Sequence, residues 1–204
     1  MPLPPSPGRK ELHHRQIDLR VFERADGLYE VEGQVLDTKA HPIWRVLADQ
    51  ETPPGTPLHD IRVRLVIDAN MLVHEVFASS DTTPFAVCKE ATQSLALLRG
   101  LRIGAGWNTQ VRQLLGGAAS CTHMAEMMGP LATTAIQGLS PLHRATLPVP
   151  TDAEGRPRKI DSCYAYASHR PVVETLWPQH HQPEPAAPSA TSAPADAENV
   201  KTRP

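Results

Sequence analysis

The sequence predicts a single α+β domain, built from an antiparallel sheet of about four strands followed by three helices packed on one face of the sheet. In the first half of the chain, apolar and polar residues alternate, which is typical of strands with one buried face. In the second half, the apolar residues recur every three or four positions, as on an amphipathic helix. With 204 residues, of which 40% are hydrophobic, the chain can form one such core but not a second full domain.

The strand-like half reads as two hairpins. Residues 16–24 and 28–35 alternate on either side of a short turn, and residues 61–67 and 71–78 do the same around a turn at residues 68–70. Strands joined by such short turns pair in an antiparallel manner. We therefore expect four antiparallel strands in sequence order.

Three helices are expected in the second half. The first is bounded by Pro84, whose missing amide suits a helix start, and Gly100, which can end a helix in the left-handed conformation. The second covers residues 108–115. The third begins near Thr122, and Pro130 is expected to kink or split it.

The two ends of the chain are rich in proline and poor in large apolar residues. Residues 1–10 and 179–204 are therefore expected to be disordered, because they cannot bury enough surface to offset the entropy of ordering them. This leaves one domain at residues 11–178, which a short hairpin of residues 161–167 and 172–177 is expected to close.

Charge and cysteine content exclude several classes of protein. A formal net charge of -2 disfavours nucleic-acid binding, and no apolar run has the length of a membrane span or the form of a signal peptide. We therefore expect a cytoplasmic protein that binds neither nucleic acid nor membrane. Three widely spaced cysteines, Cys88, Cys121 and Cys163, suit reduced thiols or metal ligands better than a disulfide framework.

The segment from residue 116 to residue 127 is the strongest candidate for a site. It places Cys121 and His123, two soft-metal ligands, at the apparent start of a helix whose amides favour a thiolate. Two other interpretations remain open. The segment could be an ordinary helix start with a small buried thiol, or Cys121 could be a nucleophile with His123 as its base, although the sequence indicates no third orienting group.

Further ligands are needed to complete a metal site. Cys88 shares a helical face with apolar residues and suits packing, but it could also join a tetrahedral site. His59 and Asp60 begin a predicted strand, where one of them must face outward. The cofactor expected at such a site is zinc or an iron-sulfur cluster. The expected metal ligands are Cys88, Cys121, His123, His59 and Asp60.

Several short stretches resemble a bacterial family of unknown function, DUF2889. The resemblance spans residues 10–178 and implies no established activity. The matching stretches are Asp26-Gly27, Leu58-His59-Asp60, residues 64–68, Gly106-Trp107, Gly117, Cys121-Thr122-His123 and residues 161–164.

The order of features is also similar to the iron-sulfur assembly scaffolds of the NifU and IscU type. An Ala-Ser-Ser segment at residues 78–80 precedes a helix with Cys88, and Cys121 and His123 precede a Leu-Ala-x-x-Ala-Ile pattern at residues 131–136. In those scaffolds, three cysteines, an aspartate and a histidine hold zinc or a nascent cluster. The resemblance implies that Cys88 matches the middle cysteine, Cys121 and His123 the last pair, and His59-Asp60 the position of the first cysteine and its aspartate.

Three functions follow from these observations. The first is a small cytosolic metal-binding or iron-sulfur-associated accessory protein that uses the expected ligands. The second is a module that binds a small ligand or a protein partner without metal. The third is a thiol enzyme that relies on Cys121 and His123. The oligomeric state is not indicated by the sequence.

Overall fold

The computed structural model describes residues 3–183 of the chain. Residue contacts group the chain into two compact units, residues 1–146 and residues 147–204, and each unit is described by itself. Most of the tail expected at residues 179–204 lies outside the described residues, so that expectation and the expected domain limits stay predictions.

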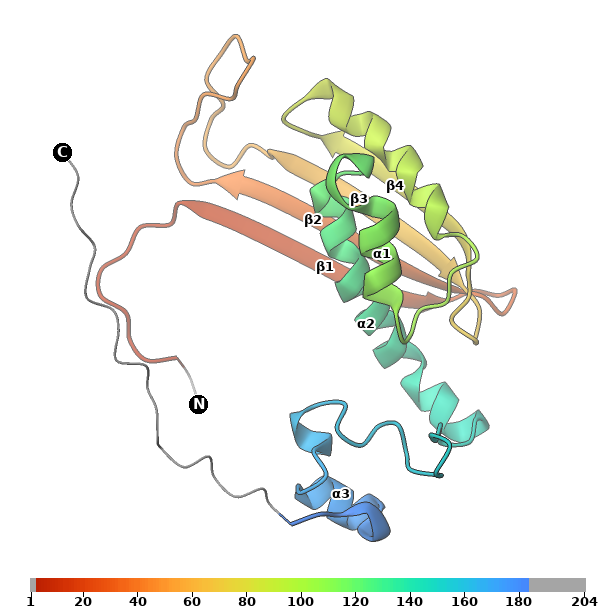
Figure 1. The fold of residues 1–204 in the computed structure, drawn as a ribbon. Helices are drawn as coiled ribbons and strands as arrows, with labels where there is room; N and C mark the ends of the chain where they lie inside the picture. Colours follow the sequence, from red (N-terminus) through yellow and green to blue (C-terminus); the bar gives the residue numbers. More distant parts are fainter. Residues whose placement is uncertain (1–2, 184–204) are drawn as a thin grey trace, which may run out of the picture. The chain divides into compact units, whose positions relative to one another are not determined.

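The first unit contains the predicted four-stranded antiparallel sheet, in the order β1-β2-β3-β4 (Figure 1). Each strand pairs with its sequence neighbour, which confirms the two expected hairpins and adds the pairing between them. The first strand begins three residues earlier, and the second ends four residues later, than the alternating pattern indicated. The strands are β1 His13–Glu23, β2 Tyr29–Lys39, β3 His59–Ile67 and β4 Val73–Thr82.

A long connection, residues 40–58, joins β2 to β3. Both of its ends are fixed by backbone hydrogen bonds, because the amide of Gly55 donates to the carbonyl of Lys39 and the amide of Leu58 donates to that of Asp37. Within it, Ile43 and Thr52 pair through two backbone hydrogen bonds, and Thr52 is buried. The tip beyond this pair, residues 44–51, is mostly exposed and includes the apolar side chains of Trp44 and Leu47.

One face of the sheet forms the core. Side chains alternate between the faces of a strand, so Val31 and Val35 of β2 and Ile61 and Leu65 of β3 are buried together. Arg62 and Arg64 of β3 are exposed on the opposite face, whereas Val66 near the end of the strand is buried. Over most of β3 this is the one-sided burial that the alternating pattern predicted.

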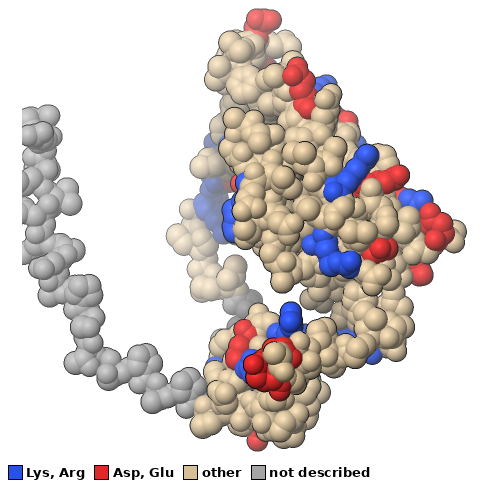
Figure 2. Space-filling view, turned by 45° about the vertical axis from the view of Figure 1, so that its right-hand side comes forward, with Lys and Arg blue, Asp and Glu red and all other residues tan. Residues whose placement is uncertain are grey.

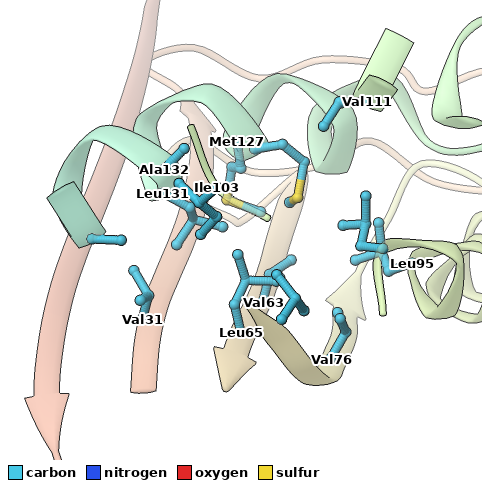
Figure 3. Packing of buried hydrophobic residues seen from close by; sticks show 14 of the residues in the cluster. Val31, Val63, Leu65, Val76, Leu95, Ile103, Val111, Met127, Leu131 and Ala132 are labelled. Atoms are coloured by element: carbon cyan, nitrogen blue, oxygen red, sulfur yellow. The ribbon is translucent and has the colours of Figure 1, made fainter. Parts of the chain in front are cut away.

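The helical half covers the buried face of the sheet. It consists of η1 Ala86–Leu98, α1 Trp107–Leu115 and α2 Thr122–Thr146. Helix α2 lies across β1 and β2, and η1 packs along β4 (Figure 1). Figure 3 shows Met127 and Leu131 of α2 directed at Val63 and Leu65 of the sheet.

The helix count differs from the expected three. The described residues contain these three helices and a fourth, α3 Pro171–Leu176, in the second unit. The first expected helix is a 3-10 helix, in which the hydroxyls of Thr92 and Ser94 donate to carbonyls three residues back. Its fully buried residues, Leu95 and Leu98, are three apart, as a repeat of three residues per turn requires.

Pro130 does not split α2, so the split, one of the two outcomes expected of this proline, is wrong, whereas the kink stays a prediction. The helix is continuous over 25 residues and contains both Pro130 and Pro141. Proline removes one backbone hydrogen bond, but buried residues on either side of Pro130, Met127 and Leu131, hold the helix against the sheet. Tertiary packing therefore outweighs the local preference.

Trp107 connects α1 to α2. The residue before it, Gly106, has a left-handed conformation with φ of 84°, which turns the chain into α1. The Trp107 ring is buried, and its indole N–H donates to the carbonyl of Met128 over 2.9 Å. This bond fixes α1 against the first third of α2.

The hairpin expected at residues 161–167 and 172–177 is wrong. The structure has a short 3-10 turn at Tyr164–Tyr166 and then helix α3. Pro171 occupies the first turn of α3, where its fixed φ and missing amide suit a helix and cannot serve a central strand. The alternation of apolar and polar residues in this segment is short, and the helix-starting preference of Pro171 prevails over it.

No helix in residues 3–183 combines the length and the apolar character that a membrane crossing requires. On the face seen in Figure 2, acidic and basic side chains are interspersed, and neither sign of charge forms a continuous patch. This distribution agrees with the small net charge of the chain.

The packing of α2 on the sheet predicts a large effect of one substitution. Leu131→Ala removes a fully buried side chain and should lower the free energy of unfolding by about 2–5 kcal/mol. The matched control is Ile136→Ala on the same helix, because Ile136 is 43% exposed and its loss should cost under about 1 kcal/mol. Urea denaturation of both variants tests this, and equal losses would contradict the assigned burial.

Candidate functional site

The candidate site is centred on Asp37, near the end of β2. Strand alternation places Asp37 in the same row as Val31, Gly33 and Val35, which face the core. Its side chain is only 2% exposed. A carboxylate at the edge of an apolar row must be paired, because an unpaired buried charge is strongly unfavourable.

The sheet register supplies two of the partners of Asp37. Arg15 of β1 and His59 of β3 lie directly opposite it on either side. Arg15 donates two hydrogen bonds to the two carboxylate oxygens over 2.7 and 2.8 Å, and Nδ1 of His59 lies 3.0 Å from Oδ2. Three adjacent strands thus contribute one polar residue each to a single row.

These contacts determine the ionisation of Asp37. Burial alone would raise the pKa of the Asp37 carboxyl, but the hydrogen bonds and charge of Arg15, with help from His59, outweigh burial and lower the pKa to about 2. Asp37 is therefore an anion at neutral pH.

The start of α2 brings two more polar groups to this row. The carbonyl of Cys121 accepts the first helical hydrogen bond, from Ala125, so Cys121 is the N-cap residue and His123 lies in the first turn. Sγ of Cys121 is 3.8 Å from Nδ1 of His123, and Nε2 of His123 is 4.0 Å from Oδ2 of Asp37. We call Arg15, Asp37, His59, Cys121 and His123 the Asp37 cluster.

A short glycine-rich turn positions Cys121. Gly117 has a left-handed φ of 62°, and the segment Gly117–Ala119 forms one 3-10 turn between α1 and α2. The hydroxyl oxygens of Ser94 and Ser120 are 2.6 Å apart, and this hydrogen bond ties the turn to η1. The residue before Cys121 is therefore held by side-chain contact as well as by the turn.

The two imidazoles of the cluster contact each other. The ring centroids of His59 and His123 are 3.9 Å apart, and the ring planes are inclined by 38°. Burial lowers the pKa of His123, and the proximity of His59 and Arg15 lowers it further. His123 is therefore neutral at pH 7, which is the form that binds metals and accepts protons.

Two residues surround the cluster on its exposed side. Nε2 of His13 is 3.4 Å from Oδ1 of Asp37, so this histidine lies at the edge of the site. Glu126 of α2 lies 3.6 Å from Arg15 and is mostly exposed. Arg15 therefore has one buried carboxylate partner and one exposed partner.

Asp37, His59 and His123 are the group of potential ligand residues in residues 3–183 that lie close enough together to hold a metal ion. One ligand atom from each lies within 4.8 Å of the other two. Ligands of a tetrahedral zinc ion lie about 3.4 Å apart, given metal-ligand bonds of about 2.0–2.2 Å. A contraction of up to about 1.4 Å would therefore bring these atoms to binding distance.

The structure brings together three of the five expected ligands: His59, Cys121 and His123. Asp60 lies on the opposite face of the sheet, where Gln34 donates to it over 2.6 Å and Arg62 over 3.1 Å. Cys88 is half-buried on η1, and no hydrogen bond or ion pair among the described residues joins it to the cluster. Their roles as ligands stay predictions.

Sequence reasoning missed Asp37 and Arg15. Both continue the apolar phase of a strand past the end of its apolar residues: Arg15 lies two residues before Ile17, and Asp37 lies two residues after Val35. A charged residue in the buried phase of a strand was the available signal. It was overlooked because the predicted strands ended at residue 35 and began at residue 16.

The low pKa of Asp37 predicts how stability depends on pH. The folded value of about 2 lies below the ordinary value of 3.8, so ionised Asp37 should stabilise the fold by about 2 kcal/mol above pH 4. This contribution should be lost as pH falls from about 4 towards 2. In urea denaturation, the deficit of Asp37→Asn relative to wild type should thus narrow on acidification.

A matched substitution serves as the control for this measurement. Asp18 pairs with Arg20, and both side chains are more than half exposed. Asp18→Asn should change stability little at any pH, because exposed ion pairs contribute little. A deficit of Asp37→Asn that is the same at every pH would contradict the assigned ionisation.

Comparison with known proteins gives one match. No curated protein and no solved structure shows significant similarity to the chain, so the NifU and IscU resemblance gains no support. A family model described as "Protein of unknown function (DUF2889)" matches residues 13–137, a narrower range than residues 10–178 but one that contains the whole Asp37 cluster. With more than half of its length matched, the chain belongs to the DUF2889 family.

Proposed function

We propose that this protein binds one transition-metal ion of the zinc class at the Asp37 cluster, with Asp37, His59, His123 and Cys121 as ligands. The observation that carries the proposal is the convergence of Asp37, His59 and His123 from two neighbouring strands and the start of α2, with one ligand atom of each within 4.8 Å of the others. The Cys121 thiol lies 3.8 Å from the other nitrogen of His123, so its entry as the fourth ligand requires a side-chain rotation. The four residues are separated by up to 86 positions in sequence, since Asp37 and His123 are the outermost of the four. Local chain geometry alone does not produce such a meeting.

The donor set favours zinc over other metals. Two imidazoles and a thiol are borderline or soft ligands, which suit zinc and similar ions, whereas magnesium and calcium prefer oxygen atoms throughout. The narrower form of the proposal is association with an iron-sulfur cluster. Such clusters are held mainly by several thiolates, and Cys121 is the single cysteine of the Asp37 cluster, so zinc is the favoured occupant.

Arg15 supports the proposed site from outside the ligand set. Its two hydrogen bonds hold the plane of the Asp37 carboxylate and keep it ionised. Residues that orient a ligand in this way influence metal affinity strongly, by about 10- to 100-fold. Arg15 also balances the negative charge that Asp37 and a Cys121 thiolate would bring to the metal.

Metal analysis of the untagged full-length protein tests the proposal. After purification without chelators, mass spectrometry should find one equivalent of zinc per chain. His123→Ala and Cys121→Ala each remove a ligand from the start of α2 and should reduce the zinc content by more than about tenfold. Cobalt substitution should add a thiolate charge-transfer band that Cys121→Ala abolishes.

The matched control is His74→Ala. His74 lies on β4 and pairs with Asp68 at the β3-β4 turn, so its loss removes a histidine-carboxylate pair outside the cluster. This variant should retain its zinc. Folded wild-type protein that takes up no zinc, cobalt or iron after dialysis against each ion would refute metal binding.

A further inference from the structure

We propose that Cys121, His123 and Asp37 form a nucleophilic thiol site that accepts activated acyl groups, as in esters and thioesters. This activity goes beyond metal binding and belongs to the protein without a metal at the cluster. Its basis is the order of the three groups. The thiol of Cys121 faces one nitrogen of His123, and the carboxylate of Asp37 faces the other.

This order is the one that nucleophilic catalysis requires. A base must contact the nucleophile with one ring nitrogen while an acidic group near the other nitrogen orients the ring and stabilises its charge. The contacts, 3.8 Å from Sγ to Nδ1 and 4.0 Å from Nε2 to Oδ2, are long. Such contacts commonly tighten when substrate binds, and a shift of about 1 Å would close the second one.

The surroundings of the three groups restrict their movement. Arg15 holds the Asp37 carboxylate with two hydrogen bonds, and the ring of His59 packs against that of His123 at 3.9 Å. Oδ2 of Asp37 lies 3.0 Å from Nδ1 of His59 and 4.0 Å from Nε2 of His123, so His59 is the closer of the two histidines. Asp37 is thus a positioning residue for His123, and Cys121 is the reacting group.

The start of α2 supplies hydrogen-bond donors for the carbonyl oxygen of the acyl group. The amides of the first helical turn, from Thr122 to Met124, have no acceptor within the helix. They lie beside the N-cap residue Cys121 and can stabilise the oxyanion that forms when its sulfur adds to a carbonyl. Cys121 is half-buried, and the proposed reaction requires that an acyl compound reach its sulfur from the exposed side.

The reaction balances with water as the second reactant. His123 takes the thiol proton of Cys121, the sulfur bonds to the acyl carbon, and the bond from that carbon to the leaving group breaks. The leaving group departs with the bonding electron pair and receives the proton from His123. Water, deprotonated by His123, then adds to the acyl carbon. The bond to sulfur breaks, the thiol regains the proton, and a carboxylic acid is released.

The experiment uses full-length protein, treated with a chelator, and p-nitrophenyl acetate as the probe. We expect a burst of about one p-nitrophenolate per chain and one acetyl group on Cys121, located by peptide mass spectrometry. Cys121→Ser should abolish the burst. His123→Gln should slow it about 100-fold while the fold, followed by circular dichroism, is retained.

Cys163→Ser is the matched thiol control, because Cys163 is exposed in the second unit and should not contribute to the burst. Equal acetylation of Cys88, Cys121 and Cys163, or an unchanged burst in folded His123→Gln, would overturn the proposal. The two proposals fail separately: zinc content measures metal binding, and the burst in metal-free protein measures the thiol. If both hold, added zinc should suppress the burst in wild-type protein.

Discussion

The ion pair between Arg15 and Asp37 is the contact on which the site depends. Asp37 occupies a position at the end of a buried strand row that an apolar residue would fill at less cost. It is tolerated there because Arg15 satisfies both carboxylate oxygens. Without this pair, the carboxylate would be either protonated or drawn towards water. His59 and His123 would then lose the anion around which they gather.

The fold gives this pair its position through register. Arg15, Asp37 and His59 are aligned because β1, β2 and β3 pair without interruption around them. A slip of one residue would send one of these side chains to the opposite face of the sheet. The remaining groups, Cys121 and His123, depend on where α2 begins, and the buried contact of Trp107 with α2 helps to hold that helix in place.

The sequence predicted the architecture well and the site only in part. Alternation identified all four strands, and apolar spacing identified the helices of the first unit, because both patterns record a buried face directly. The start of β1 and the end of β2 were missed, since the residues there are polar, and Arg15 and Asp37 were missed with them. The predicted split of α2 at Pro130 was wrong because the contacts that keep α2 continuous come from the sheet, which local sequence does not reveal.

Cys121, His123 and His59 were recognisable from residue type and spacing, whereas their companions were not. Asp60 was as plausible as Asp37 from sequence, and only strand phase separates them: Asp60 follows His59 by one residue and therefore turns to the other face. Cys88 had the right chemistry for a ligand, but it lies on η1 rather than at the start of α2. Three-dimensional pairing, not composition, selected the members of the cluster.

The long β2-β3 connection has a consequence for how such a site can vary. Asp37 and His59 stand at its two ends, yet they meet through strand pairing and not through the connection itself. Residues 44–51, the tip beyond the Ile43–Thr52 pair, can therefore be lengthened, shortened or replaced at low thermodynamic cost, since loop-closure entropy changes slowly with length. The sequence of the loop can thus change while the pairing of β2 and β3 keeps Asp37 and His59 together.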